Sequence, residues 1–356
     1  MININISKAK TGMVLAKAVY DREGKLLLEK GIKLQKMYIE NFKKQNIKNI
    51  SICATVNRKA IKDDYINDEL INRTLNIIKN SYINLRISQK IDIQEIENIV
   101  LEIVEDLSSR EFFILSNNIM KSIDEYNYNH SINVCILSLV LGIALKFNKA
   151  ELKKLGTGAL LHDIGKIKIS HKILNKPDLL TDTEYQEIQK HPLFGYEMAK
   201  DMEGISKESM WVIRDHHERY DGKGYPNRIS GKNIHIYPKI VAICDVYDAL
   251  TSNRVYRKGI PPNQAIEYLI SMGNHQFDYE LVRIFIKQIC VYPVGTIVRL
   301  ATGEEAQVIK NHENWPTRPI VRVIKNKKGE PLDIAKEIDL TKQLDNHVVD
   351  ILNTAL

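Results

Sequence analysis

The sequence predicts a mainly α-helical protein with a small α+β module at its N-terminus and a small β subdomain at its C-terminus. Three patterns support this fold class. From Asn117 to Cys290, apolar residues recur as one helix after another, with only brief polar loops between them. Short runs of β-branched residues follow Pro293, and another β-rich stretch precedes Ala54. The expected domains are residues 1–62, 63–115, 116–290 and 291–356.

The N-terminal module, residues 1–62, is expected to combine short strands with one helix. The stretch Gly12–Tyr20 predicts a strand, and the turn that follows contains Gly24, which permits a sharp reversal of the chain. A helix is expected over Gln35–Lys44, before a last strand over Ile47–Ile52.

The two regions that flank the main helical domain differ in the secondary structure that their sequences predict. Residues 63–115 show helical spacing of apolar residues, so we expect helices that connect the first module to the main domain. Residues 291–356 predict a β-rich subdomain with a short closing segment near Leu340–Ala355. Its expected strands lie over Val294–Gly303, Ala306–Ile309 and Pro319–Ile324.

Composition and charge narrow the functional classes. Hydrophobic residues make up 44% of the 356-residue chain and charged residues 27%, which is typical of a globular protein. The net charge is +7, but lysines alternate with acidic residues, so no basic stripe indicates a DNA or RNA polymer as partner. The apolar run Ile132–Leu145 is shorter than the roughly 20 residues of a membrane span. Four cysteines without a CxxC pair favour a reducing, cytoplasmic location.

Histidine and aspartate residues gather within the main helical region. His162 and Asp163 are adjacent at the end of an apolar helix, a pair that by itself is a weak signal. Further residues of the same types accompany it: His130, His191, His216, His217 and Asp245. Imidazole and carboxylate ligands without thiolates suit catalytic first-row metals. Two such metals favour phosphodiester hydrolysis, with a metal-bound hydroxide as nucleophile.

Two motifs resemble those of a known family. His162-Asp-Ile-Gly-Lys166 and His216-His-Glu-Arg-Tyr-Asp-Gly-Lys-Gly-Tyr-Pro226 together are similar to the HD-GYP domain, and the resemblance covers about Asn117 to Cys290. The resemblance implies an all-helical domain that hydrolyses cyclic di-GMP to pGpG or GMP in bacterial second-messenger signalling. It also implies two divalent transition metals, with Fe or Mn expected ahead of Zn or Ni.

The resemblance also assigns roles to individual residues. The position one helical turn before His130, which holds Glu in the three-metal members of the family, is Tyr126 here, so a two-metal site is expected. The implied metal ligands are His130, His162, Asp163, His191, His216, His217 and Asp245. Asp163 and Lys166 are the expected catalytic residues, and Lys166, Tyr225, Arg254 and Arg257 are the expected substrate contacts. Asp248, nearly one turn after Asp245, is expected to orient a ligand.

Three functions remain open at this point. The first is a cyclic di-GMP phosphodiesterase, with a homodimer as a possible assembly. The second is a receptor that binds a cyclic dinucleotide without cleaving it, although the intact ligand set argues against this reading. The third is a metal hydrolase for another substrate, such as cyclic GMP-AMP or a nucleotide, because base recognition cannot be deduced from the motifs.

Overall fold

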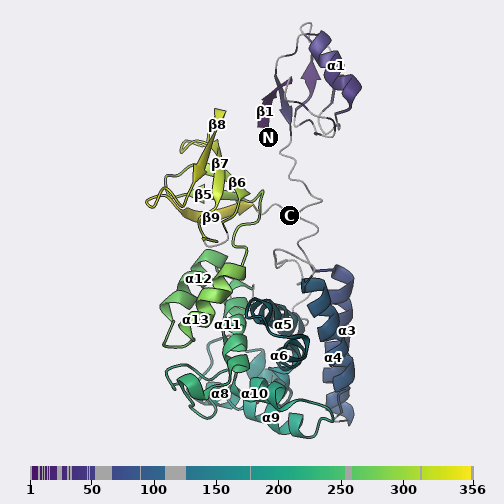
Figure 1. Ribbon diagram of the computed structural model, residues 1–356, viewed down its shortest axis with the longest axis vertical. Coiled ribbons are helices and arrows are strands. Elements are labelled where there is room, and N and C mark those ends of the chain that lie inside the picture. The colour runs from purple at the N-terminus through teal and green to yellow at the C-terminus, as the bar shows by residue number, and fades with distance from the viewer. Residues whose placement is uncertain are drawn as a thin grey trace. The chain divides into compact units, whose positions relative to one another are not determined.

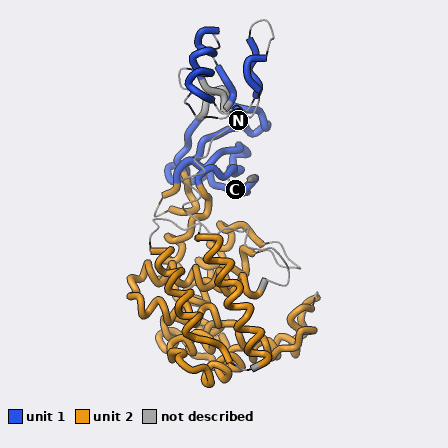
Figure 2. The backbone as a smooth tube through the Cα atoms, turned by 90° about the vertical axis from the view of Figure 1, so that its right-hand side faces the viewer, with its two compact units in different colours: residues 1–62, 294–310, 320–356 blue, residues 63–293, 311–319 orange. Residues whose placement is uncertain are grey.

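The computed structural model shows a chain divided into two compact units (Figure 2). Unit 1 comprises residues 1–62, 294–310 and 320–356, and unit 2 comprises residues 63–293 and 311–319. The structure describes residues 2–6, 9, 11, 13, 15, 17–21, 26–29, 32, 34–45, 47, 49–52, 66–88, 90–108, 126–176, 178–252, 259–312 and 315–353.

The N-terminal part of unit 1 is a small α+β module, as predicted (Figure 1). Its strands pair antiparallel, β1 with β4 and β2 with β3. The helix packs Phe42 into a small apolar core with Leu15 and Leu34. The elements are β1 (Ile2–Asn5), β2 (Val19–Tyr20), β3 (Leu26–Leu28), α1 (Lys36–Lys44) and β4 (Asn49–Ile52).

The C-terminal part of unit 1 is an antiparallel sheet of five strands in the order β8-β7-β6-β5-β9. Alternate side chains on its strands are buried, for example Val298 and Leu300 on β5 and Val321 and Val323 on β7, because successive residues point to opposite faces. The strands are β5 (Ile297–Leu300), β6 (Glu305–Lys310), β7 (Ile320–Lys325), β8 (Pro331–Asp339) and β9 (Val348–Asn353). The last two strands were not predicted as such.

Unit 2 is helical throughout its regular structure within the described residues (Figure 1). Its α-helices are α3 (Asp68–Ser88), α4 (Ile93–Ser108), α5 (Tyr126–Ala144), α6 (Lys149–Leu161), α7 (His171–Leu174), α8 (Asp182–Ile188), α9 (His191–Lys200), α10 (Lys207–Asp215), α11 (Ile236–Thr251), α12 (Pro262–Ser271) and α13 (Tyr279–Gln288). Two 3-10 helices, η4 (Ile164–Lys168) and η5 (Gly231–Asn233), complete the unit. The predicted fold class is therefore confirmed. The finer domain boundaries stay predictions.

The centre of unit 2 is α5, an apolar helix that packs against α3, α6 and α11. Local signals start the neighbouring helices. Asn148 and Glu151 form a capping box at α6, and Thr181 and Glu184 form another at α8. No helix in the part of the chain that the structure describes is long and apolar enough to cross a membrane.

The helices expected as connectors, α3 and α4, pack onto the central helices of unit 2. The contact between α4 and α6 depends on a small residue, because a Cβ at Gly156 would lie 2.5 Å from Cγ1 of Val100. At the edge of the same contact, Lys153 forms an ion pair of 2.6 Å with Glu97. This layer supports α6, the helix that ends at His162.

Candidate metal centre

The seven residues predicted as metal ligands lie together in unit 2, and five of them come from helix ends. His162 ends α6, Asp163 follows it, and His191 begins α9. His216 ends α10, with His217 next in the chain. His130 and Asp245 lie within α5 and α11. Helix ends place the side chains at the meeting point of several helices, while the helix bodies form the surrounding core.

A tight contact between η4 and α9 brings Asp163 and His191 together. At Gly165, a Cβ would fall on the His191 carbonyl oxygen and lie 2.5 Å from the backbone nitrogen of Gly195. Only two glycines allow the backbones to approach this closely. The motif glycine therefore has a packing role that serves the site.

The candidate ligand atoms form two groups, and within each group they all lie within 4.8 Å of one another. The first group is Asp163, His191, His216 and His217, and the second is His130, His162 and Asp245.

Asp163 lies between the two groups. Its Oδ1 is 3.2 Å from Nε2 of His191 and 4.0 Å from Nε2 of His216. Its Oδ2 is 3.4 Å from Nε2 of His162 and 3.9 Å from Nε2 of His130. Each carboxylate oxygen therefore faces a different group, which is the arrangement required of a shared ligand.

Asp245 approaches both groups from the opposite helix, α11. Its Oδ1 is 3.1 Å from Nε2 of His130, and its Oδ2 is 4.0 Å from Nδ1 of His217. Its side chain is 12% exposed, against 5% for Asp163, so Asp245 lies nearer to the open side of the cluster.

Hydrogen bonds orient the imidazole rings toward the centre. Nδ1 of His162 is 2.8 Å from the Ala159 carbonyl oxygen, and Nδ1 of His191 is 2.7 Å from that of Ile188. Nδ1 of His216 is 3.1 Å from the carbonyl oxygens of two residues of α10. A carbonyl only accepts, so each Nδ1 carries the proton and each Nε2 presents a lone pair to the centre.

This donor set fits divalent cations. Nε2 of His191 and Nε2 of His216 are 3.3 Å apart, and both present lone pairs. Among the described residues, Nε2 of His162 and Oδ1 of Asp163 are buried without any hydrogen-bond partner. Buried acceptors that converge in this way repel one another unless a cation lies among them. Nitrogen and carboxylate oxygen donors without sulfur match Fe, Mn, Ni or Zn.

The charge states of the carboxylates and imidazoles also favour metal binding. Burial alone would raise the pKa of Asp163, but the positive charge of Lys166 holds it well below its usual range. Burial likewise acts against ionisation of Asp245, yet the hydrogen bond from His130 keeps its pKa low. Burial lowers the pKa of His217 to about 3, so this ring is neutral at physiological pH. Anionic carboxylates and neutral imidazoles are the forms that bind metals.

His130 differs from the other rings because two carboxylates surround it. Burial lowers its pKa, but hydrogen bonds to Asp245 and Asp248 outweigh that effect and raise the pKa to about 9. Asp248 lies 2.7 Å from Nδ1 of His130 and also accepts hydrogen bonds from Asn133 at 2.8 Å and Ser252 at 3.1 Å. Asn133 and Ser252 were not identified from the sequence, since polar residues on a helix carry no distinctive pattern.

The structure describes two of the four residues that are expected to contact substrate. Lys166 donates to Oδ2 of Asp163, and its side chain is 28% exposed, so it borders the cluster. The ring of Tyr225 packs against that of His217, with centroids 4.7 Å apart. Arg254 and Arg257 lie outside the described residues, and their role stays a prediction.

The loop that contains Tyr225 is held by a buried carboxylate. Glu218, 4% exposed, accepts a hydrogen bond of 2.6 Å from the backbone nitrogen of Asn227. Gly224 passes so close to the preceding turn that a Cβ there would lie 2.5 Å from the His217 carbonyl oxygen. The backbone nitrogen of Tyr225 then donates to that same oxygen at 3.2 Å. The sequence placed Glu218 in the motif, but its anchoring role became visible only in the structure.

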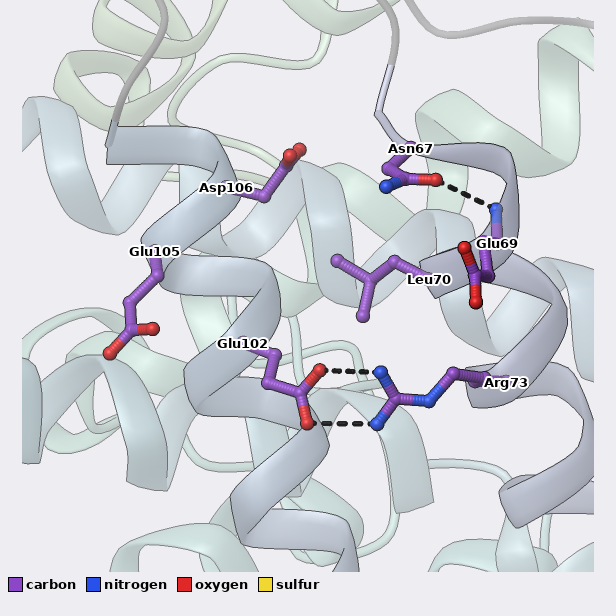
Figure 3. A pocket seen from close by; sticks show the side chains of 7 residues that line it. All are labelled: Asn67, Glu69, Leu70, Arg73, Glu102, Glu105 and Asp106. Atoms are coloured by element: carbon purple, nitrogen blue, oxygen red, sulfur yellow. Dashed lines mark hydrogen bonds and ion pairs between the residues drawn. The ribbon is translucent and has the colours of Figure 1, made fainter.

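An acidic cavity between α3 and α4 contains none of the seven residues (Figure 3). Arg73 faces Glu102 across it in a two-pronged ion pair of 2.8 and 2.9 Å. The residues that line the cavity are Asn67, Glu69, Leu70, Arg73, Glu102, Glu105 and Asp106. We assign no function to this cavity, because acidic side chains at helix ends are common on protein surfaces.

Comparison with known families agrees with this geometry. Residues 114–281 match the HD domain family, and residues 297–355 match a KOW domain associated with HD domain. The first match places an HD domain within the helical unit, and the two sequence motifs of that region resemble those of the HD-GYP type.

Its relatives include named phosphodiesterases. The chain is 36% identical over 254 residues to cyclic di-GMP phosphodiesterase PA4108 of Pseudomonas aeruginosa, covering 71% of this chain and 61% of that protein. It is 31% identical over 217 residues to cyclic di-GMP phosphodiesterase PdeB of Borreliella burgdorferi, covering 61% and 57%. It is 34% identical over 140 residues to 3'3'-cGAMP-specific phosphodiesterase 2 of Vibrio cholerae, covering 39% and 27%. The chain spans less than two thirds of the length of each relative.

Proposed function

We propose that this protein hydrolyses cyclic di-GMP to pGpG or GMP, using two divalent transition metals, with Fe or Mn as the expected ions. The observation that carries the proposal is the position of Asp163, with one carboxylate oxygen directed at each of two His/Asp groups. The similarity to PA4108 and PdeB, which are both named as cyclic di-GMP phosphodiesterases, supports cyclic di-GMP as the substrate.

Each group would supply the ligands for one metal, and Asp163 would contribute one carboxylate oxygen to each. One metal would be held by His191, His216 and His217, and the other by His130, His162 and Asp245. The chemistry that such a pair supplies when bound is polarisation of a phosphoryl oxygen and activation of water.

The protein's own residues position and stabilise the reacting groups. Lys166 keeps a positive charge at the rim, where it can offset the negative charge that develops on the phosphate. Asp248 holds the His130 ring through Nδ1, so that Nε2 points into the cluster. Tyr225 forms a wall of the substrate site beside His217, and Arg254 and Arg257 are proposed to bind the second phosphate.

A cyclic GMP-AMP phosphodiesterase is the second candidate. Its support is the similarity to the 3'3'-cGAMP-specific enzyme of Vibrio cholerae. The two substrates share the phosphodiester that reacts and differ in one base, so the metal cluster serves both reactions equally. A receptor without activity is disfavoured, because the seven predicted ligand residues are all present and close together.

The cellular location and the oligomeric state of the protein are also proposals. Cys135 and Cys244 are buried thiols outside any disulfide in the described part of the chain, and we propose a reducing compartment such as the cytoplasm. A homodimer is proposed without a defined interface.

Product chromatography tests the proposed function. The protein, purified without oxygen and supplied with Fe(II) or Mn(II), is incubated separately with cyclic di-GMP and 3'3'-cyclic GMP-AMP. Formation of pGpG or GMP supports the proposal, and faster cleavage of the mixed dinucleotide favours the second candidate. The double variant His162→Ala, Asp163→Ala should lose metal and activity while keeping its helical content. Metal binding without cleavage of either nucleotide would favour the receptor.

A further inference from the structure

Three residues just outside the second sequence motif, residues 216–226, join its two ends. Arg214 and Asp215 come directly before the motif, at the end of α10, and Asn227 comes directly after it. Nδ2 of Asn227 donates a hydrogen bond of 3.3 Å to Oδ1 of Asp215. This contact closes a segment that contains two proposed metal ligands and Tyr225.

The position of Asp215 is unfavourable for a carboxylate on its own. Asp215 is the last residue of α10 and is 2% exposed. The carbonyl end of a helix disfavours negative charge, and a buried charge is costly unless it is paired. Arg214 supplies the partner, with Nε 2.7 Å from Oδ1 and Nη2 2.8 Å from Oδ2 of Asp215. The carboxylate is therefore explained by what it binds and not by the stability of the helix.

The Arg214 side chain is held in place from a neighbouring helix. Successive residues of a helix do not face each other, so the guanidinium must bend along α10 to reach both oxygens of Asp215. The ring of Tyr196 on α9 lies beside it there, with its centroid 5.0 Å from Cζ of Arg214. Because α9 begins at His191, this contact ties the Arg214–Asp215 pair to another helix that supplies a proposed metal ligand.

Asn227 is attached to the preceding turn at two points. Its backbone nitrogen donates to Glu218 at 2.6 Å, and its side chain donates to Asp215 at 3.3 Å. One hydrogen bond leaves a residue free to rotate about it, whereas two fix its orientation. Tyr225 lies two residues earlier, and its ring packs on that of His217 with centroids 4.7 Å apart. The position of this ring therefore depends on how the loop is held at Asn227.

We propose that Arg214 and Asp215 are positioning residues for substrate binding: Arg214 fixes Asp215, and Asp215 holds Asn227 so that Tyr225 stays beside His217. This inference rests on the proposed function, in which Tyr225 forms a wall of the substrate site. Both residues act through the loop, so their loss should weaken substrate binding and leave the metals in place.

Hydrogen–deuterium exchange of the metal-loaded protein measures how firmly the loop is held. The backbone nitrogens of Tyr225 and Asn227 both donate within this segment, and their exchange requires those hydrogen bonds to open. In Asp215→Ala we expect residues 218–229 to exchange about tenfold faster, and α6 to exchange as in the parent. The variant removes a negative charge from the end of a helix, so α10 itself should remain folded.

Steady-state kinetics with cyclic di-GMP measures the consequence for the substrate. Asp215→Ala should raise KM about tenfold and change kcat and metal content by less than about twofold. Asn227→Ala, at an exposed position, should raise KM about threefold, because its backbone hydrogen bond to Glu218 remains. The double variant should match Asp215→Ala alone, since the Asn227 side chain acts through Asp215.

Glu102→Ala is the matched control. Glu102 binds Arg73 in a two-pronged ion pair of 2.8 and 2.9 Å, as Asp215 binds Arg214, but it lies on α4 and outside the motif. This variant should leave KM and the exchange of residues 218–229 within about twofold of the parent. Circular dichroism verifies that each variant folds.

Four results would overturn the inference. Exchange of residues 218–229 at the parent rate in Asp215→Ala would show that the pair does not hold the loop, and faster exchange with an unchanged KM would remove its role in substrate binding. A joint loss of metal and kcat would show that Asp215 supports the cluster instead. A parent that cleaves no cyclic dinucleotide would refute the proposed function and this role with it. That last result is distinguished because the parent, rather than the variant, lacks activity.

Discussion

Replacing Asp248 with asparagine tests whether this residue orients His130, a proposed metal ligand, from outside the proposed metal site. Asp248 is 3% exposed, and its two oxygens accept hydrogen bonds from His130, Asn133 and Ser252. In Asp248→Asn, one oxygen can still accept from Asn133 and Ser252. The new amide group would face the Nδ1 proton of His130, so that two donors oppose each other.

The size of the effect follows from the bond that is lost. The contact between Nδ1 of His130 and the Asp248 carboxylate is 2.7 Å long and buried. A hydrogen bond to a charged group contributes about 1.5–3 kcal/mol. Loss of a partner behind a metal-bound histidine costs roughly 10- to 100-fold in metal affinity, or about 1.4–2.7 kcal/mol. The two estimates agree, and we expect a fall of that size.

Competition titration of Mn(II) against a chelator measures this fall directly. Ser252→Ala is the matched control, because it removes a weaker 3.1 Å contact to the same carboxylate and leaves the His130 bond intact. We expect a loss of affinity below about threefold in the control. If Asp248→Asn binds Mn(II) as tightly as the parent, the orientation of His130 by Asp248 is refuted.

Three further predictions concern the supports of the site. Gly165→Ala should reduce metal content and lower the free energy of unfolding by about 1–3 kcal/mol, because the added Cβ would fall on the His191 carbonyl oxygen. Chemical denaturation and metal analysis measure the two effects. Values equal to those of the parent would contradict the prediction. Glu218→Ala should raise KM by releasing the Asn227 nitrogen, while Glu218→Gln, which can still accept that hydrogen bond, should stay near the parent in steady-state assays. Equal KM values for the two variants would exclude the anchor. His235 accepts the backbone proton of Tyr237 at the start of α11, and burial lowers its pKa, so the neutral ring is favoured on folding. The resulting stability should be fully present above the unfolded pKa of about 6.5 and should be lost as pH falls from that value through the lower pKa of the folded state. His235→Asn should lack this pH-dependent component in denaturation curves between pH 5 and 8, and an identical pH dependence would contradict the cap.

The sequence predicted the helical unit well because periodic apolar residues determine helices directly. Proline also suits the first turn of a helix, and α12 begins at Pro262. The sequence did not predict β8, whose sequence Pro331–Asp339 mixes charged and apolar residues, and it assigned β9 only to a closing segment. Such strands depend on pairing with neighbours, which a single strand sequence does not reveal.

The candidate site was predicted by residue type rather than by geometry. The motifs name His162, Asp163, His216 and His217, yet spacing alone cannot show that Asp163 directs one oxygen to each group. That arrangement depends on where α6 and α10 end and on where α9 begins.

The central claim is that the seven residues form two metal sites joined by Asp163. Elemental analysis of anaerobically purified protein, reconstituted with Mn(II) and freed of excess metal, tests it most directly. We expect about two metals per chain in the parent. The variant His191→Ala, His216→Ala removes two ligands of the first group only and should retain about one. A parent that binds no metal, or a variant that still binds the parent's full complement, would contradict the account.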